Sequence, residues 1–215
     1  MALLYDCSDP ETRVEAIEVA THRVQCGELV VLPTDTVYGL GADAFDPVAV
    51  TALLAAKGRG RDMPVPVLVG SRQVLDALVG TLPDSAVALV DALWPGALTI
   101  VARHTPALAW DLGDAHGTVA VRMPADRLAL DLLKDTGPMA VSSANRSGLP
   151  PATTCANAQA QLGDAVAVYL DGGPTTTSVP STIVDVTGEL PVLLRRGWIT
   201  EERLREVVPD LVAQP

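Results

Sequence analysis

Short apolar runs alternate along the chain with segments of helical periodicity. The apolar runs predict strands at residues 28–33, 65–69, 98–102, 118–123, 139–141, 165–170, 181–186 and 191–194. The periodic segments predict helices at residues 9–27, 47–57, 71–79, 83–94, 126–135, 156–162 and 201–208. The spacing is irregular, and a turn at Gly188 joins two late strands as a hairpin. We therefore expect an α/β protein of the α+β type, with a twisted mixed β-sheet and helices on its outer faces.

The spacing of these elements leaves no linker long enough to separate two domains. We expect residues 1–209 to form a single domain and residues 210–215 to form a C-terminal tail. Residues 106–117 and 175–180 have no periodicity and are expected to be irregular loops. No segment resembles a membrane span or a signal peptide, so we expect a cytoplasmic protein.

Composition narrows the class of protein further. The formal net charge of −11 argues against a protein that coats nucleic acid or an anionic membrane, although it is compatible with a local basic pocket. The three cysteines are scattered without metal-ligand spacing, and we expect them to be reduced thiols. Lys57 and Lys134 are the only lysines among 15 lysine and arginine residues, which weakly indicates a role for a compact ammonium group at position 57.

The clearest candidate chemistry lies in residues 30–68. The first apolar run of this stretch ends in Thr34, Asp35 and Thr36, after which glycines at positions 39 and 41 predict a turn. A helix capped by an aspartate follows, and three cations lie at its end: Lys57, Arg59 and Arg61. Hydroxyls at a strand end and clustered cations favour a polar, phosphate-bearing ligand. The alternative is a solvated basic loop whose cations interact favourably with the negative, C-terminal end of the helix dipole.

Further polar side chains are expected at other strands of the sheet. Alternation over residues 118–123 places Thr118 and Arg122 on one face. Hydroxyl, amide and guanidinium groups flank the later strands: Ser142, Ser143, Asn145, Ser181, Thr182 and Arg195. Taken singly, each is more often a cap, a turn residue or a surface charge. Together they predict a pocket that binds an anionic polyphosphate substrate and catalyses by positioning and charge stabilisation.

Three motif interpretations are disfavoured. The sequence Gly39-Leu40-Gly41 is a loose dinucleotide fingerprint, but the helix that should follow directly begins only at Pro47. The chain contains no Walker-type phosphate loop. The serines at positions 142 and 143 lie outside any nucleophile elbow and have no histidine near them in sequence, which disfavours a serine hydrolase.

Eight motifs in order resemble the YrdC-like family of L-threonylcarbamoyladenylate synthases. They are PTDTVYGLGADAF (33–45), AAKGRGRDMPV (55–65), WPGALT (94–99), TVAVRMP (118–124), VSSANRSG (141–148), DGG (171–173), PSTIVDV (180–186) and LLRRG (193–197). The resemblance spans nearly the whole chain and corresponds to the short, single-domain form. It implies a YrdC-like fold and a nucleotidyltransferase that forms L-threonylcarbamoyladenylate from L-threonine, bicarbonate and ATP, with release of pyrophosphate.

The resemblance also implies the residues of the site. An L-threonine pocket would contain Thr36, Leu68, Arg122, Val141 and Ser181, with Arg122 as the carboxylate clamp. The nucleotide side would contain Lys57, Arg59, Thr118, Ser143, Asn145 and Arg195, together with Met63 and Pro151. Lys57 and Arg59 would be catalytic, and their replacement by Ala is expected to remove most turnover while leaving the fold intact. Mg²⁺ is expected on the phosphates, with no metal ligand from the protein.

In this family, partner proteins transfer the threonylcarbamoyl group to an adenosine of tRNA. The resemblance therefore implies such partner proteins and a weak contact with tRNA, and it implies no binding to a membrane. The chain departs from the family pattern at Gly60 and Arg61, which makes Arg61 a further candidate for phosphate binding, and at Leu68, where some members have a polar residue. Two alternatives remain. One is an RNA-binding or ribosome-associated module, which the net charge of −11 disfavours. The other is a paralogue with a different adenylate-forming or hydrolytic activity, which the intact motifs disfavour.

Overall fold

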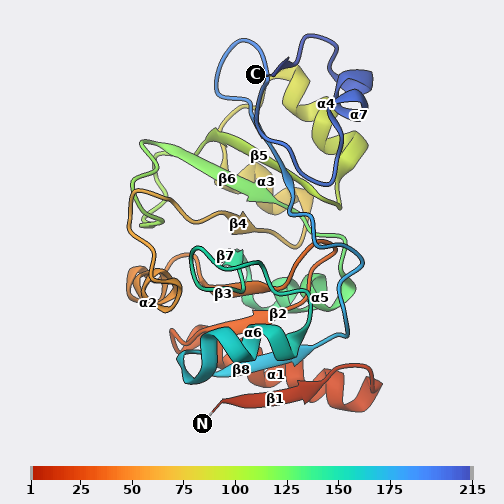
Figure 1. The fold of residues 1–215 in the computed structure, drawn as a ribbon. Helices are drawn as coiled ribbons and strands as arrows, with labels where there is room; N and C mark the ends of the chain where they lie inside the picture. The colour runs from red at the N-terminus through yellow and green to blue at the C-terminus, as the bar shows by residue number, and fades with distance from the viewer. Residues whose placement is uncertain (1, 214–215) are drawn as a thin grey trace.

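The structure is a computed structural model that describes residues 2–213 (Figure 1). Its strands are β1 (Leu3–Asp6), β2 (Val30–Leu32), β3 (Gly39–Asp43), β4 (Val67–Leu68), β5 (Leu98–Arg103), β6 (Thr118–Arg122), β7 (Met139–Ser143), β8 (Val168–Asp171), β9 (Thr182–Asp185), β10 (Val192–Arg195) and β11 (Val212–Ala213). They form one mixed sheet in the order β1-β8-β2-β3-β7-β4-β6-β5-β9-β10-β11.

The α-helices alternate with these strands along the chain. They are α1 (Pro10–Gln25), α2 (Pro47–Lys57), α3 (Arg72–Leu78), α4 (Asp84–Leu93), α5 (Arg127–Thr136), α6 (Cys155–Leu162) and α7 (Glu201–Val207). A short 3₁₀ helix, η1 (Gly163–Ala165), follows α6. Strand β1 and helix α7 lie at opposite ends of the molecule (Figure 1). Over residues 2–213, no helix is both long and apolar enough to cross a lipid bilayer.

Capping residues place the helices where the sequence predicts them. Asp46 accepts hydrogen bonds from two backbone N–H groups in the first turn of α2, and Pro47 takes the first helical position. Gly58 ends α2 in the left-handed conformation, at a φ of 62°. Side-chain caps also begin α1, α5 and α7: Asp9, Asp126 and Thr200. These signals place Lys57 on the last turn of α2 and Arg59 just beyond it.

Alternate residues of the strands pack into two apolar cores on opposite faces of the sheet. In β2, Val30 and Leu32 belong to the core that contains α1 and α5, whereas Val31 belongs to the core that contains α2 and α6. Strand β8 alternates in the same way, with Val168 in the first core and Tyr169 in the second. The prediction of a mixed sheet with helices on its outer faces is therefore confirmed.

One region of the sheet has helices on a single face within the described residues. In β4, β5, β6 and β9, Ile100 and its neighbours pack with α3, α4 and α7. The opposite face presents Leu68, Thr99, Arg122 and Ile183, which line a cavity. Leu68 also belongs to the core of α1 and α5. The cavity therefore lies on the part of that face that α1 and α5 leave open.

The turn predicted at residues 39 and 41 is wrong, because both glycines lie within β3. This strand pairs antiparallel with β2 and with β7. A Cβ on Gly39 would lie 2.6 Å from Val141 Cγ1, and a Cβ on Gly41 would lie 2.6 Å from Met139 Cε. The glycines thus let side chains of β7 occupy space beside the backbone of β3. Glycine serves close packing here, which local sequence patterns do not distinguish from a turn.

The two ends of the chain also differ from the prediction. Strand β1, which the sequence analysis does not predict, is only four residues long and pairs parallel with β8. The predicted tail is wrong for its described part, because Leu211 is buried and β11 pairs with β10. Gln214 and Pro215 lie outside the described residues. Residues 106–117 and 175–180 contain no helix or strand, as predicted.

Gly197, just after β10, makes a close backbone contact beside the cavity. A Cβ on Gly197 would overlap the carbonyl carbon of Ser181 and would lie 2.5 Å from Pro180 O. Both are backbone atoms, which cannot move aside as the end of a flexible side chain can. The glycine of the LLRRG motif therefore lets the chain after β10 pack against the segment that carries Ser181.

We predict that Gly197→Ala lowers the free energy of unfolding by about 1–3 kcal/mol, because the added methyl group overpacks against backbone. Gly80→Ala is the matched control, since a Cβ there would meet no atom within 4 Å. Its effect should stay within about 0.5 kcal/mol. Urea denaturation followed by circular dichroism measures both changes, and a Gly197→Ala protein as stable as Gly80→Ala would contradict the described contact.

Candidate functional site

A cavity of about 340 Å³ on the open part of the sheet contains most of the residues predicted for the site. Nine of them line it: Thr36, Arg59, Leu68, Arg122, Val141, Ser143, Pro151, Ser181 and Arg195. The sheet face supplies some of these side chains, and the segments that follow β2, α2 and β7 and precede β9 supply the others. Segments far apart in sequence therefore meet in one place, at a volume typical of small-molecule sites.

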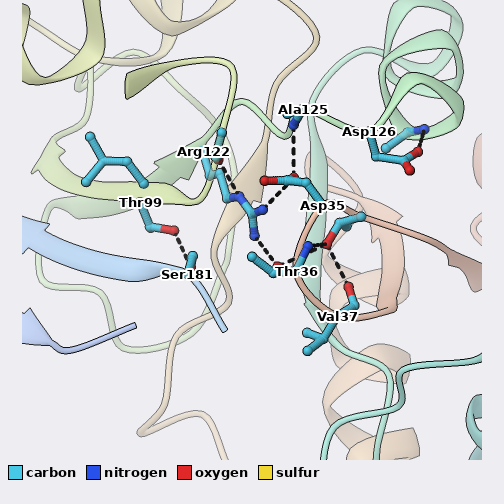
Figure 2. Close-up of polar contacts among 12 residues, drawn as sticks. Asp35, Thr36, Val37, Thr99, Arg122, Ala125, Asp126 and Ser181 are labelled. Atoms are coloured by element: carbon cyan, nitrogen blue, oxygen red, sulfur yellow. Dashed lines mark hydrogen bonds and ion pairs between the residues drawn. The ribbon is translucent and has the colours of Figure 1, made fainter. Parts of the chain in front are cut away.

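Arg122 is held on three sides by acceptors of the protein. Its Nε donates to Gly96 O at 2.9 Å, its Nη1 to Thr36 Oγ1 at 2.9 Å and its Nη2 to Asp35 Oδ1 at 2.6 Å. Figure 2 shows the guanidinium directed toward Asp35 and Thr36. Burial lowers the pKa of Arg122, and the nearby charge of Asp35 opposes this shift.

The bonds of Arg122 leave it prepared for a ligand. An arginine has five N–H groups, one on Nε and two on each terminal nitrogen. In Arg122, one N–H on each of the three nitrogens donates to an acceptor among the described residues. One N–H on each terminal nitrogen therefore remains. A carboxylate can accept from N–H groups of this kind, so Arg122 is suited to hold a carboxylate.

A chain of hydroxyl groups continues from Arg122 into the turn after β2. Thr34 Oγ1 donates to Val37 O at 2.7 Å, so its contact of 3.1 Å with Thr36 Oγ1 must be donated by Thr36. Thr36 Oγ1 in turn accepts from Arg122. This direction of bonding leaves one lone pair on Thr36 Oγ1, which can accept a hydrogen bond from an amine or ammonium group.

A second polar group lies where β9 and β10 meet the cavity. Arg195 donates to Ser181 O from Nε at 3.0 Å and from Nη2 at 2.8 Å, and to Ser181 Oγ from Nη2 at 3.0 Å. Ser181 Oγ also shares a hydrogen bond of 2.8 Å with Thr99 Oγ1 (Figure 2). These bonds fix the Arg195 guanidinium at the cavity and leave its Nη1 without a partner among the described residues.

Arg59 reaches the cavity from the loop after α2. Its Nη1 donates to Ser142 Oγ at 3.3 Å, and its Nε is buried without a hydrogen-bond partner among residues 2–213. Burial lowers the pKa of Arg59, while loss of water and then the charges of Arg122 and Arg59 lower the pKa of Arg195. Neither Arg59 nor Arg195 forms an ion pair with a described carboxylate. The charge of Asp62 acts on Arg59 only without direct contact. An anion entering the cavity would therefore meet two arginines that have no paired carboxylate.

Lys57 lies behind the wall of the cavity and is not part of its lining. Its Nζ donates to Ser143 O, to Asn145 O at 2.8 Å and to Asn145 Oδ1 at 3.2 Å, which uses all three N–H groups of an ammonium. Asn145 Nδ2 donates to two carbonyls of the following loop. Burial, and secondarily the charge of Arg59, lower the pKa of Lys57 to about 8. Lys57 and Asn145 thus hold the segment that carries Ser143.

Three other candidates also lie outside the lining. Met63 is exposed, and the hydroxyl of Thr118 donates to a backbone carbonyl at 2.7 Å. Arg61, a candidate for phosphate binding, pairs instead with Asp111 at 2.6 Å and with Asp114 at 3.8 Å. These pairs connect the loop after α2 to the irregular segment before β6. Arg61 therefore supports the loop that carries the cavity arginine and does not enter the cavity itself.

Some lining residues were not assigned from the sequence. The open sheet face contributes four of them: Thr99, Val101, Ala120 and Ile183. Thr99 alternates with the fully buried residues Leu98 and Ile100, in the way that Arg122 alternates with Val121. The alternation that places Arg122 on the cavity face would have found Thr99 too, had it been applied to β5.

Lys57→Met tests the supporting role of the lysine. We predict that the free energy of unfolding falls by at least about 2 kcal/mol. Two acceptors of Asn145 lose their donor and Ser143 O keeps only the backbone N–H of Asn145, which outweighs the relief of a buried charge. We therefore no longer expect that replacing Lys57 leaves the stability of the fold unchanged. Lys134→Met, at an exposed position of α5, is the control and should change stability by less than about 0.5 kcal/mol. Urea midpoints measure both, and equal midpoints would contradict the role.

Comparisons with known proteins identify the family. A family model described as Sua5_yciO_yrdC, telomere recombination, matches residues 22–197. A relative from Mycobacterium tuberculosis is 57% identical over 208 residues, which cover 97% of this chain and 96% of the relative. Threonylcarbamoyl-AMP synthase of Bacillus subtilis (strain 168) is 42% identical over 183 residues, which cover 84% of this chain and 53% of that enzyme.

A solved structure extends the similarity to the whole fold. The crystal structure of Pyrococcus abyssi Sua5 complexed with L-threonine matches this chain with a TM-score of 0.92 and 34% sequence identity. The match covers 100% of this chain and 63% of that one, so the chain spans only part of the longer Bacillus and Pyrococcus proteins. The family model covers most of the chain, and the identity exceeds 30% over nearly all of it; the protein belongs to the Sua5/YciO/YrdC family.

Proposed function

We propose that this protein is an ATP-dependent synthase that forms L-threonylcarbamoyladenylate, or threonylcarbamoyl-AMP, from L-threonine, bicarbonate and ATP, with release of pyrophosphate. One observation carries the proposal: a single cavity contains an arginine prepared for a carboxylate and two arginines without a carboxylate partner among the described residues. The name of the Bacillus subtilis relative and the L-threonine bound to Pyrococcus abyssi Sua5 support it.

The amino acid is assigned to the part of the cavity around Arg122. The two remaining N–H groups of Arg122 would hold the carboxylate of L-threonine, and the free lone pair of Thr36 Oγ1 would accept from its amine. Leu68 and Val141 would contact the methyl group, and the hydroxyl of Ser181 lies in the same cavity. This assignment uses all five residues predicted for the L-threonine pocket.

The nucleotide is assigned to the arginines that have no carboxylate partner. Arg59 and Arg195 would bind the phosphates of ATP, and the hydroxyl of Ser143, which has no hydrogen-bond partner in the described chain, would add a neutral donor. Pro151 lines the same cavity. Contacts of Met63 and Thr118 with the nucleotide stay predictions, as does a direct contact of Lys57, whose ammonium would have to release one of its present acceptors.

The chemistry consists of two bond-forming steps. The amine of L-threonine and bicarbonate give a carbamate with loss of water, and a carbamate oxygen then attacks the α-phosphorus of ATP. The bond from the α-phosphorus to the bridging oxygen breaks, and pyrophosphate leaves. Arg59 and Arg195 would stabilise the negative charge that develops on the phosphates, and the cavity would hold the reactants in contact.

Other participants follow from this chemistry. Over residues 2–213 no three histidine, cysteine or acidic side chains gather at a possible metal site, so Mg²⁺ would be held mainly by the phosphates of ATP. The product is a reactive mixed anhydride, which partner proteins would use to modify tRNA in the cytoplasm. We propose that residues 1–209 act as one unit, because residues between positions 34 and 195 line the same cavity.

The test is a pyrophosphate-release assay in which L-threonine and bicarbonate are omitted in turn. Release should require both compounds together with ATP, and mass spectrometry should identify threonylcarbamoyl-AMP as the second product. Arg59→Ala should reduce release to background while leaving the L-threonine pocket intact, because it removes a cavity charge that holds the phosphates. Pyrophosphate release that persists without L-threonine would contradict the proposed function.

A further inference from the structure

Asp35 pairs with Arg122 from a position outside the lining of the cavity. Its Oδ1 accepts from Arg122 Nη2 at 2.6 Å and from the backbone N–H of Ala125 at 2.9 Å (Figure 2). The side chain of Asp35 is 19% exposed, and that of Arg122 is 8% exposed. The backbone contact fixes the carboxylate, so Asp35 cannot turn away from the arginine without losing both bonds.

This pairing distinguishes Arg122 from the other two arginines of the cavity. Among the described residues, Arg59 donates to a hydroxyl, and Arg195 donates to a hydroxyl and a carbonyl. Neither forms an ion pair, although the charge of Asp62 acts on Arg59 without direct contact. The Arg122–Asp35 pair carries no net charge but still offers two directed N–H groups. The cavity therefore contains two kinds of anion site, one selected by charge and the other by hydrogen-bond geometry.

Two anions of different charge must share this cavity if the proposed function is correct. A triphosphate carries several negative charges and a carboxylate carries one, so three uncompensated arginines would favour phosphate at every position. A phosphate on Arg122 would then exclude the amino acid. The neutral pair removes this advantage of charge and retains two N–H groups that can donate to a carboxylate.

On the basis of the proposed function, we propose that Asp35 is a positioning residue that sets the specificity of Arg122. It fixes the orientation of the guanidinium and compensates its charge, so that Arg122 accepts the carboxylate of an amino acid and rejects the phosphates of the nucleotide. Asp35 touches neither ligand and acts through Arg122 alone.

One variant, with a matched control, separates the charge of Asp35 from its shape. In Asp35→Asn, the side-chain oxygen can still accept from Ala125 N–H and from Arg122, so the geometry is kept while the negative charge is lost. Asp111→Asn is the matched control, because Asp111 Oδ1 also bridges an arginine, Arg61 at 2.6 Å, and a backbone N–H. That pair lies outside the lining of the cavity.

The experiment measures inhibition of pyrophosphate release by inorganic tripolyphosphate. In the wild-type protein, tripolyphosphate should compete with ATP and not with L-threonine. In Asp35→Asn it should compete with both, and its inhibition constant against L-threonine, divided by the KM for L-threonine, should fall at least about tenfold. The KM for ATP should change little, which shows that the variant is folded. Asp111→Asn should behave as the wild-type protein does.

A binding measurement keeps the outcome independent of turnover. Calorimetric titration with tripolyphosphate should show binding to Asp35→Asn that is at least about tenfold tighter than to the wild-type protein or to Asp111→Asn. Failure of the proposed function would appear separately, as wild-type pyrophosphate release that ignores L-threonine. Competition between tripolyphosphate and L-threonine in the wild-type protein would overturn the role of Asp35, as would a ratio in Asp35→Asn within twofold of wild type.

Discussion

The gathering of like charges in one cavity is the constraint on which the rest of this structure depends. Arg59, Arg122 and Arg195 all line the cavity. The charge of Arg59 adds to burial in lowering the pKa of Lys57, and the charges of Arg122 and Arg59 do the same to the pKa of Arg195. Charges in such a place repel one another unless fixed acceptors hold them. Asp35, Ser142 and the backbone near Ser181 supply those acceptors. Part of the anion site is thus preorganised before any ligand binds.

The sheet provides the rigidity, and its incomplete cover provides the space. Helices α1 and α5 bury one face beside β2, β7 and β8, and the same face is open where Thr99, Ala120 and Arg122 project. Small side chains at two of these positions leave room for ligands. Close backbone contacts complete the walls, because Gly39 and Gly197 admit neighbours that a Cβ would exclude. Lys57 adds a buried support beneath Ser143, so one cation serves the architecture while the others face the cavity.

Local features of the sequence predicted the elements well because their causes are local. Caps such as Asp46 and Gly58 fixed helix ends, and alternation over residues 118–123 correctly placed Arg122 opposite the core. Nine of the site residues that the resemblance to a family implies line one cavity. The order of the strands in residues 2–213 was not predictable in this way, because β1 pairs with β8 and β5 with β9 across long stretches of chain.

The predictions that were wrong or could not be made from the sequence also have physical causes, which are contacts between distant segments. The pattern at Gly39 and Gly41 predicts a turn wrongly, because glycine is required there by a side chain of another strand. The direction of Lys57 could not be predicted, since a lysine at a helix end can extend into solvent or, as here, toward carbonyls of a distant segment. The pairing of Asp35 with Arg122 depends on a contact between residues 87 positions apart. The spacing of residues along the chain does not indicate such contacts.

The central claim is that one cavity binds an amino acid and a nucleotide side by side, each on its own arginines. A crystal structure with L-threonine and an ATP analogue whose α–β bridge is an uncleavable methylene group tests it most directly. The account predicts the carboxylate of L-threonine on Arg122 and the phosphates on Arg59 and Arg195, with the amine facing the α-phosphorus. Phosphates bound at Arg122, or either ligand bound outside the cavity, would contradict it.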